Sequence, residues 1–186
     1  MKTYKQTRKD SCGPSAMLMA VEYLRPGTIP MTPEEEHRIH DQIGMKGKER
    51  YTLPCSICKF LVGLDFKMKF FEYKPELKHR LMRQLMALDA RIRRTITNNF
   101  QYIAGDFTTD NIAEELDQNR AVMVAVNLNK SYDNPRLHWY FVYKHDKSGF
   151  TIADPRLGKI ITEPKSELEE LIKLPDGCKV CISIED

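Results

Sequence analysis

The stretch HWYFVYKHDKSGFTIADP, residues 138–155, decides the fold class. Residues 138–144 form an apolar, aromatic run typical of a strand, and residues 150–155 form a second such run. Between them lies Asp146-Lys147-Ser148-Gly149, a turn sequence that ends in glycine. Two short apolar runs joined by a turn of this kind predict an antiparallel β-hairpin.

Three further runs in the C-terminal part have the character of strands. Residues 121–128 (AVMVAVNL) and 178–184 (CKVCISI) are short and rich in β-branched side chains, and residues 159–162 add a short strand. A helix is expected at 166–174, before the last strand. The sequence therefore predicts that residues 120–186 form an antiparallel sheet.

The part of the chain before this sheet, residues 12–119, is predicted to be mainly helical. Helices are expected at 12–24, 33–43, 55–62, 76–98 and 109–119, with Thr32 and Thr109 as N-caps and a single strand at 66–73. Helices first and antiparallel strands second are typical of an α+β fold. We expect one domain over residues 1–186, with N-terminal helices packed on a C-terminal antiparallel sheet.

The composition is that of a globular domain without a strong charge. The chain has 186 residues, of which 41% are apolar, and 29 basic against 26 acidic residues give a net charge of +3. This balance does not favour nucleic-acid binding, and no apolar run approaches the ~18–20 residues of a transmembrane helix. The N-terminus MKTYKQTRKDSCGP holds no hydrophobic stretch, so we expect no signal peptide and a cytoplasmic location.

Cys12 is the first candidate for chemistry, because it stands where an apolar helix is predicted to begin. A helix N-terminus offers unpaired backbone N–H groups and the positive end of the helix dipole, and both favour a thiolate. A thiolate in such a place can act as a nucleophile in covalent catalysis. The alternative is a buried, small hydrophobic side chain, as most cysteines are. Position alone leaves both open.

His138 is the candidate base among the five histidines. His37, His40 and His79 lie in predicted helices rich in charge and are expected to face solvent, whereas His138 opens the apolar strand of the hairpin. Asp154 ends the partner strand, and antiparallel pairing can bring it beside His138. A carboxylate there would fix the imidazole tautomer and stabilise its charged form. Alternatively, Asp154 only initiates a turn before the proline that follows it.

Four short motifs in matching order resemble papain-like cysteine peptidases. Gln6 followed by Asp10-Ser11-Cys12-Gly13-Pro14-Ser15-Ala16 resembles their N-terminal signature, and residues 138–142 with 152–155 resemble the later half. Residues 53–70, a predicted helix before a strand, are similar as well. The order and spacing are most similar to the bacteriocin-processing peptidase family, which trims double-glycine leader peptides, and its stand-alone relatives. The helix at 76–98 is longer than that fold requires.

The resemblance implies a papain-like fold and a cysteine peptidase acting on a peptide or isopeptide through a thioester, without cofactor or metal. It assigns Cys12 as nucleophile, His138 as general base and acid, and Asp154 as the residue that orients His138. Gln6 would donate its side-chain amide to the oxyanion. An acyltransferase or deamidase using the same triad, and a catalytically silent peptide-binding domain, stay open as alternatives. Because the resemblance is to bacterial proteins, it adds a second alternative for the location: export of the chain as an effector or toxin without a cleavable signal.

Two Cys-x-x-Cys pairs raise a different alternative, a zinc-stabilised interaction module. They are Cys55/Cys58 and Cys178/Cys181, far apart in the sequence. The second pair lies in a predicted strand, where positions three apart face opposite sides. We therefore favour four structural, buried cysteines and expect no metal.

A basic stripe marks the predicted helix at 76–98. Its members lie on one side, turned away from the leucines, and are Arg80, Arg83, Arg91 and Arg94. Such a stripe is usually a solvated face, but it also fits an acidic partner. Both interpretations stay open, and we expect no nucleic acid there.

Overall fold

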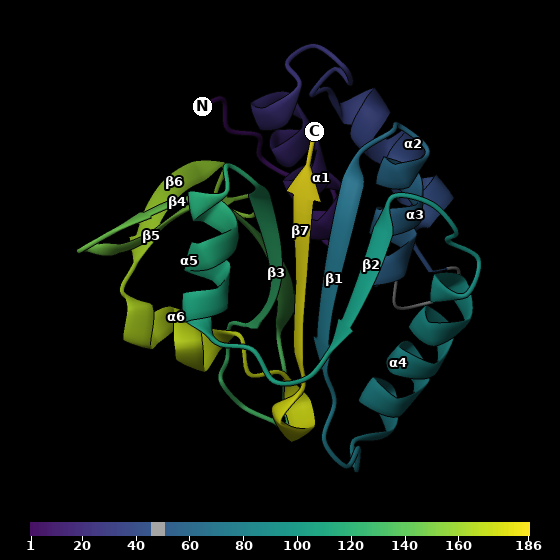
Figure 1. The fold of residues 1–186 in the computed structure, drawn as a ribbon, viewed down its shortest axis with the longest axis vertical. Coiled ribbons are helices and arrows are strands. Elements are labelled where there is room, and N and C mark those ends of the chain that lie inside the picture. The colour runs from purple at the N-terminus through teal and green to yellow at the C-terminus, as the bar shows by residue number, and fades with distance from the viewer. Residues whose placement is uncertain (46–50) are drawn as a thin grey trace.

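A computed structural model describes residues 1–45 and 51–186, and its framework is one seven-stranded sheet. The strand order is β2-β1-β7-β3-β4-β5-β6, with the last strand of the chain in the interior of the sheet (Figure 1). The strands are β1 (Lys67–Tyr73), β2 (Phe100–Ala104), β3 (Ala121–Asn127), β4 (Leu137–Asp146), β5 (Gly149–Asp154), β6 (Lys159–Glu163) and β7 (Lys179–Glu185). Only β1 and β2 pair in parallel; the other neighbours are antiparallel.

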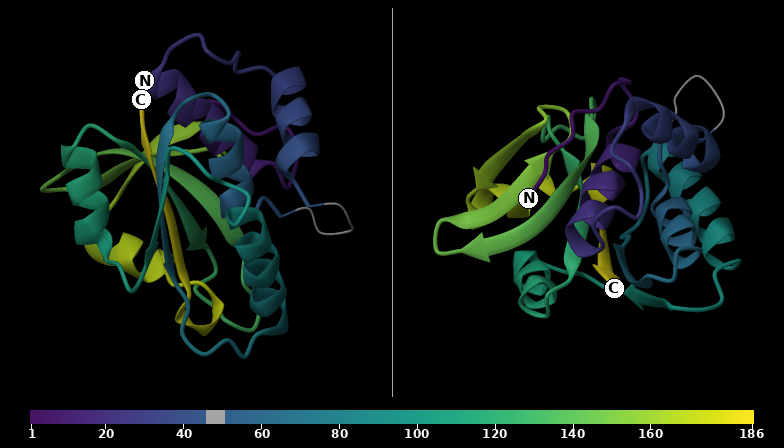
Figure 2. Two further views of the ribbon diagram at one scale, coloured as in Figure 1. Left: turned by 45° about the vertical axis from the view of Figure 1, so that its right-hand side comes forward. Right: turned by 90° about the horizontal axis from the view of Figure 1, so that it is seen from above.

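Helices cover both faces of the sheet. They are α1 (Cys12–Leu24), α2 (Pro33–Ile43), α3 (Pro54–Val62), α4 (Arg80–Arg93), α5 (Thr109–Asp117) and α6 (Lys165–Leu171), with a short 3₁₀ helix at Pro175–Gly177. The first four helices lie on one side of the sheet, and α5 and α6 lie on the other (Figure 2). Each side encloses its own apolar core, and the side chains of β3 and β4 contribute to both.

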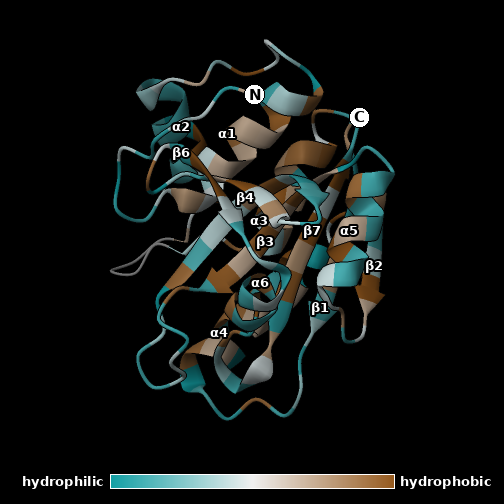
Figure 3. Cartoon of the chain, turned by 90° about the vertical axis from the view of Figure 1, so that its left-hand side faces the viewer, coloured by the Kyte–Doolittle hydropathy of each residue, from teal (hydrophilic) through white to brown (hydrophobic). Residues whose placement is uncertain are grey.

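The central helix is α1, whose composition explains its place. Its residues Ala16–Val21 are all fully buried, against β4 and β3, because the run carries no charged side chain. The helices α1 and α2 differ in hydropathy. In Figure 3, α1 has mainly hydrophobic colouring and α2 has mainly hydrophilic colouring. The helix α2 begins as predicted: Thr32 accepts a hydrogen bond from the Glu35 N–H at 3.3 Å, and Pro33 takes the first helical position.

The α+β fold class is confirmed, and so is the hairpin, in which Asp146 of β4 pairs with Gly149 of β5. The sheet, however, is not confined to residues 120–186, nor wholly antiparallel. It also takes in β1 and β2 from the N-terminal half, and β2 was not predicted at all.

The long helix predicted at 76–98 is shorter, because both of its ends are drawn into other structure. Before it, the backbone N–H groups of Lys78 and His79 donate to Asp176 Oδ2, at 2.9 and 2.6 Å, so helix α4 starts only at Arg80. After it, Asn99 turns the chain with φ +51° into β2. The N-cap of α5 is also displaced by one residue, to Thr108 in place of Thr109.

Among the helices of the described residues, none combines the length and the apolar character that crossing a membrane requires.

Candidate active site

Cys12 is the first residue of α1 and stands at the edge of the core. Its side chain is half-buried, while the next nine residues of the helix, 13–21, are all buried and therefore fixed in place. The residue after it must be small, because a Cβ on Gly13 would lie 2.7 Å from the Thr52 side chain. No acidic side chain lies in the first turn of α1, so nothing there opposes a negative charge on the sulfur.

His138 and Asp154 come together at the ends of the neighbouring strands β4 and β5. The His138 Nε2 to Asp154 Oδ1 distance is 2.8 Å, and both side chains are buried. The backbone N–H of Arg156 also donates to Asp154 Oδ1, at 2.8 Å, and holds the carboxylate in place. Since Nε2 faces Asp154, the other ring nitrogen, Nδ1, is the one left for Cys12. The hairpin thus produces the juxtaposition expected from the sequence.

The electrostatics of this pair favour its charged state. Burial lowers the pKa of His138, but hydrogen bonds with Asp154 and Cys12 outweigh burial and raise that pKa above its usual 6.5. Burial raises the pKa of Asp154, but the His138 bond and the Arg156 N–H hold that pKa below its usual 3.8. A histidine in this state can carry the positive charge that a neighbouring thiolate requires.

Gln6 lies in the segment that leads to Cys12 and lines the same pocket as Cys12 and His138. Its backbone N–H donates to the Pro155 carbonyl at 2.8 Å, which ties this segment to the end of β5. Its side-chain Nε2 donates to the carbonyls of Arg8 and Lys9, at 2.7 and 3.1 Å. The structure therefore places Gln6 at the site, with its amide hydrogens engaged by the loop before Cys12.

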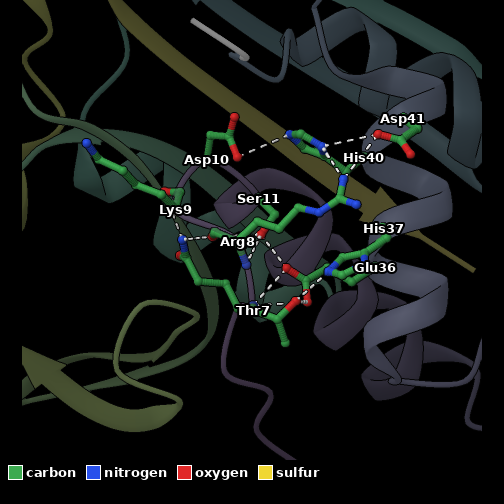
Figure 4. A network of polar contacts seen from close by, with 10 residues as sticks. Thr7, Arg8, Lys9, Asp10, Ser11, Glu36, His37, His40 and Asp41 are labelled. Carbon is green, nitrogen blue, oxygen red and sulfur yellow. Dashed lines mark hydrogen bonds and ion pairs between the residues drawn. The ribbon is translucent and has the colours of Figure 1, made fainter.

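A buried carboxylate that sequence reasoning missed, Glu36 of α2, holds this loop (Figure 4). Glu36 is fully buried and accepts hydrogen bonds from the Tyr4 hydroxyl at 2.7 Å, from the N–H and hydroxyl of Thr7, and from the Ser11 hydroxyl. The available signal was its spacing, because Glu36 lies three and seven residues before Ile39 and Ile43, on the apolar side of its helix.

His40 corrects one expectation, since it does not face solvent but is buried beneath the same loop. Its ring lies 3.7 Å from Asp10 and 3.5 Å from the Arg8 guanidinium (Figure 4). The physical reason is that this face of α2 is covered by the segment preceding Cys12. His37 and His79 are half-buried.

The pocket beside Cys12 and His138 has a volume of about 690 Å³. One end is polar and is formed by the loop before Cys12 with Arg136 and Arg156. The other end is mainly apolar and reaches α4, whose contributions are Met82, Leu85, Met86 and Asp89. The site therefore opens into a space large enough for several residues of a peptide.

The four other cysteines are buried and far less acidic than an exposed thiol. Burial raises the pKa of Cys178 to about 12 and raises those of Cys55, Cys58 and Cys181 further. Cys178 and Cys181 contribute to cores on opposite sides of the sheet, as expected for strand positions three apart. Within residues 1–45 and 51–186, no group of three or more His, Cys, Asp or Glu side chains is arranged to hold a metal ion.

The basic stripe of α4 is exposed at all four positions, Arg80, Arg83, Arg91 and Arg94. An acidic partner for it stays a prediction.

The fold matches that of a solved peptidase-like protein. The crystal structure described as a putative C39-like peptidase from Bacillus anthracis aligns with a TM-score of 0.54, over 99% of this chain and 94% of that chain, at 10% sequence identity. The fold is therefore of the papain-like class found in C39-like peptidases. No protein-family model matches the sequence, and no curated protein matches it.

Proposed function

We propose that the chain is a cysteine peptidase, or a related thiol hydrolase, that cleaves a peptide or isopeptide bond. The observation that carries the proposal is the 2.8 Å bond between His138 Nε2 and Asp154 Oδ1, on a histidine that lines the same pocket as Cys12 and whose pKa Cys12 helps to raise. A nucleophile, a base and a group that orients the base are what covalent acyl transfer requires. The likeness of the fold to a C39-like peptidase supports the same function.

In the first half of the reaction, the Cys12 proton passes to His138 Nδ1 and the thiolate sulfur attacks the carbonyl carbon. The new C–S bond forms as the carbonyl oxygen takes a negative charge. His138 then returns the proton to the leaving nitrogen, the C–N bond breaks, and a thioester remains on Cys12. Asp154 keeps the ring oriented and stabilises its positive charge during the transfer.

In the second half, water replaces the amine. His138 Nδ1 takes a proton from the water, whose oxygen attacks the thioester carbon. The C–S bond then breaks, the carboxylic acid leaves, and the proton returns to Cys12. An amine in place of the water would make the protein an acyltransferase, and a side-chain amide as substrate would make it a deamidase.

Charge on the carbonyl oxygen requires donors, for which Gln6 and the Cys12 backbone N–H are the candidates. Gln6 Nε2 makes the longer of its two bonds, 3.1 Å, to the Lys9 carbonyl. We expect the N–H of this bond to donate to the substrate oxygen in place of the Lys9 carbonyl. One such donor is worth about 3 kcal/mol in the transition state.

The test is the reaction of each cysteine with limiting iodoacetamide at about pH 6, followed by mass spectrometry. An ordinary thiol of pKa ~8.5 is under ~1% ionised at that pH. We expect selective labelling of Cys12 in the wild type, with a rate that falls about tenfold or more in His138→Ala and by a smaller factor in Asp154→Asn. Buried Cys55 and Cys178 serve as internal controls.

Labelling of Cys12 no faster than that of Cys178 would overturn the proposal and favour the catalytically silent peptide-binding domain. If Cys12 is selectively labelled, peptide substrates then distinguish the three reactions of the site by their products. Hydrolysis gives a free amine and an acid, acyl transfer gives a new amide, and deamidation gives ammonia.

A further inference from the structure

The part of the pocket that α4 lines is apolar except for one carboxylate. Met82, Leu85 and Met86 of α4 line it and are at most 8% exposed. Asp89 follows them by seven, four and three residues, respectively, and lines the same space at 2% exposure. This spacing places all four side chains on one side of the helix. An apolar wall thus ends in a buried acid.

Among the residues that the structure describes, Asp89 has no cation as an ion-pair partner. Its Oδ1 accepts the backbone N–H of Cys55 at 2.8 Å, at the start of α3. Arg93, one turn later on the same helix, lowers the pKa of Asp89 by its charge, but its guanidinium bonds Glu72 at 3.1 Å and stacks on the Tyr102 ring at 3.6 Å. In the part of the chain that the structure describes, no ion pair within 4.0 Å includes Asp89. A buried carboxylate of this kind is costly unless a ligand supplies the missing charge.

The acid lies within reach of the candidate nucleophile through one short segment. Thr52 contacts the helix start beside Cys12, and Cys55, three residues later, donates to Asp89. Residues 52–54 line the pocket between these two points. A substrate with its carbonyl at Cys12 can therefore send one side chain toward Asp89.

We propose that this part of the pocket, defined by Met82, Leu85, Met86 and Asp89, is a specificity site for a lysine or arginine side chain of the substrate. The inference rests on the proposed peptidase function. The methylenes of such a side chain match the apolar wall, and its charged end matches a carboxylate that has a free lone pair. A wholly apolar side chain of the same length leaves the buried charge unpaired.

The polar end of the pocket does not oppose this preference strongly. Lys9 and Arg136 are exposed there, so water and salt screen their charge. Arg8 is paired with Asp41 and Arg156 with Asp154. Asp89 acts at contact distance in a buried space, where a charge interaction is strongest.

The experiment measures peptide binding to the Cys12→Ala protein, so that it does not depend on catalysis. Acetylated tetrapeptide amides, whose ends and remaining residues are uncharged, carry either lysine or its uncharged analogue norleucine at one position at a time, and calorimetry gives Kd. We expect lysine to bind about tenfold more tightly at one position, as for one charge-assisted hydrogen bond. Asp89→Asn, which keeps an acceptor for the Cys55 N–H, should abolish the preference. Asp117→Asn, the same charge change at an exposed site, should retain it.

A second measurement needs no substitution at Asp89. Its carboxyl carbon is followed by NMR during a pH titration, and a bound lysine peptide should lower its pKa while the norleucine peptide should not. Equal or tighter binding of norleucine at every position, absence of binding by both series, or a preference that survives Asp89→Asn would each overturn the inference. The iodoacetamide reaction of wild-type Cys12 tests the proposed function separately, so the two failures can be told apart.

Discussion

Three buried carboxylates show how local donors decide the charge of a residue in this protein. Burial raises the pKa of each. Asp154 and Glu36 nevertheless have lowered pKa values, because His138 and several hydroxyl and N–H groups donate to them. Among the described residues, Asp89 accepts hydrogen bonds only from Cys55, and burial therefore raises its pKa to about 6. Two of these acids are thus satisfied within the chain, and the third is the one left for a ligand.

The role of Glu36 can be tested by Glu36→Gln. A glutamine has one acceptor oxygen and turns an NH₂ group toward donors such as the Thr7 N–H and the Ser11 hydroxyl. Each donor left unsatisfied costs ~1–3 kcal/mol. We expect urea unfolding to show a loss of that size in the free energy of unfolding. We also expect slower labelling of Cys12, since Glu36 anchors the loop before Cys12.

The pH dependence of this effect has a definite sign. The pKa of Glu36 is lower in the folded protein than its usual 4.5, so its stabilisation is complete above pH 4.5 and is lost as the pH falls through the folded value. The difference in stability between wild type and Glu36→Gln should therefore shrink in acid. A difference that stays constant from pH 7 to pH 3 would contradict this account.

At the scale of elements, the turn of the β4–β5 hairpin depends on Gly149. Its φ is +133°, and a Cβ there would lie 2.1 Å from the Glu163 carbonyl oxygen of β6. We expect Gly149→Ala to destabilise the protein by about 2 kcal/mol or more, through both strain and collision. The midpoint temperature of thermal unfolding should then fall by about 2–4 °C for each kcal/mol of stability lost.

Gly27→Ala is the matched control for that substitution. Gly27 also has a positive φ, +79°, but nothing lies within 4 Å of its Cβ position. Only strain remains, so a loss of about 1 kcal/mol is expected. If both variants unfold at the same temperature, the contact with Glu163 is not what fixes the hairpin.

Elements with strong local signals could be predicted from the sequence, and elements set by distant contacts could not. The helix from Cys12 and the hairpin carry their own apolar pattern and turn residues, so both were predicted correctly. The helix predicted at 76–98 was too long because its leucine spacing continues, while Asp176, far along the chain, holds the residues before Arg80. The strand β2 was missed because it gains its order from pairing with β1.

The same division holds for the site. Cys12, His138 and Asp154 could be proposed from the sequence, because a helix start and one hairpin bring them near each other. Glu36 and Asp89 could not, because their importance arises where α2 meets the N-terminal segment and where α4 meets α3. These are tertiary contacts between segments whose relative position no local pattern records.

At the scale of the whole molecule, β7 joins two parts of the sheet that otherwise do not touch. It pairs with β1 on one side and with β3 on the other, so that β2-β1 and β3-β4-β5-β6 meet only through the end of the chain (Figure 1). Val180, Ile182 and Ile184 of β7 are at most 2% exposed. Neither part of the sheet can complete its core on the α1–α4 side before this strand is in place.

Removal of residues 178–186 should therefore abolish cooperative unfolding in urea and not merely lower the midpoint of the transition. Circular dichroism measures the unfolding. Removal of Asp186 alone is the control, because it costs only the exposed pair with Arg25, worth about 1 kcal/mol or less. If the shortened chain unfolds in a single transition near that of the full chain, the two parts of the sheet fold independently. His138 and Asp154, on β4 and β5, would then be positioned without β7, whereas α1, which carries Cys12, packs against the core that β7 completes.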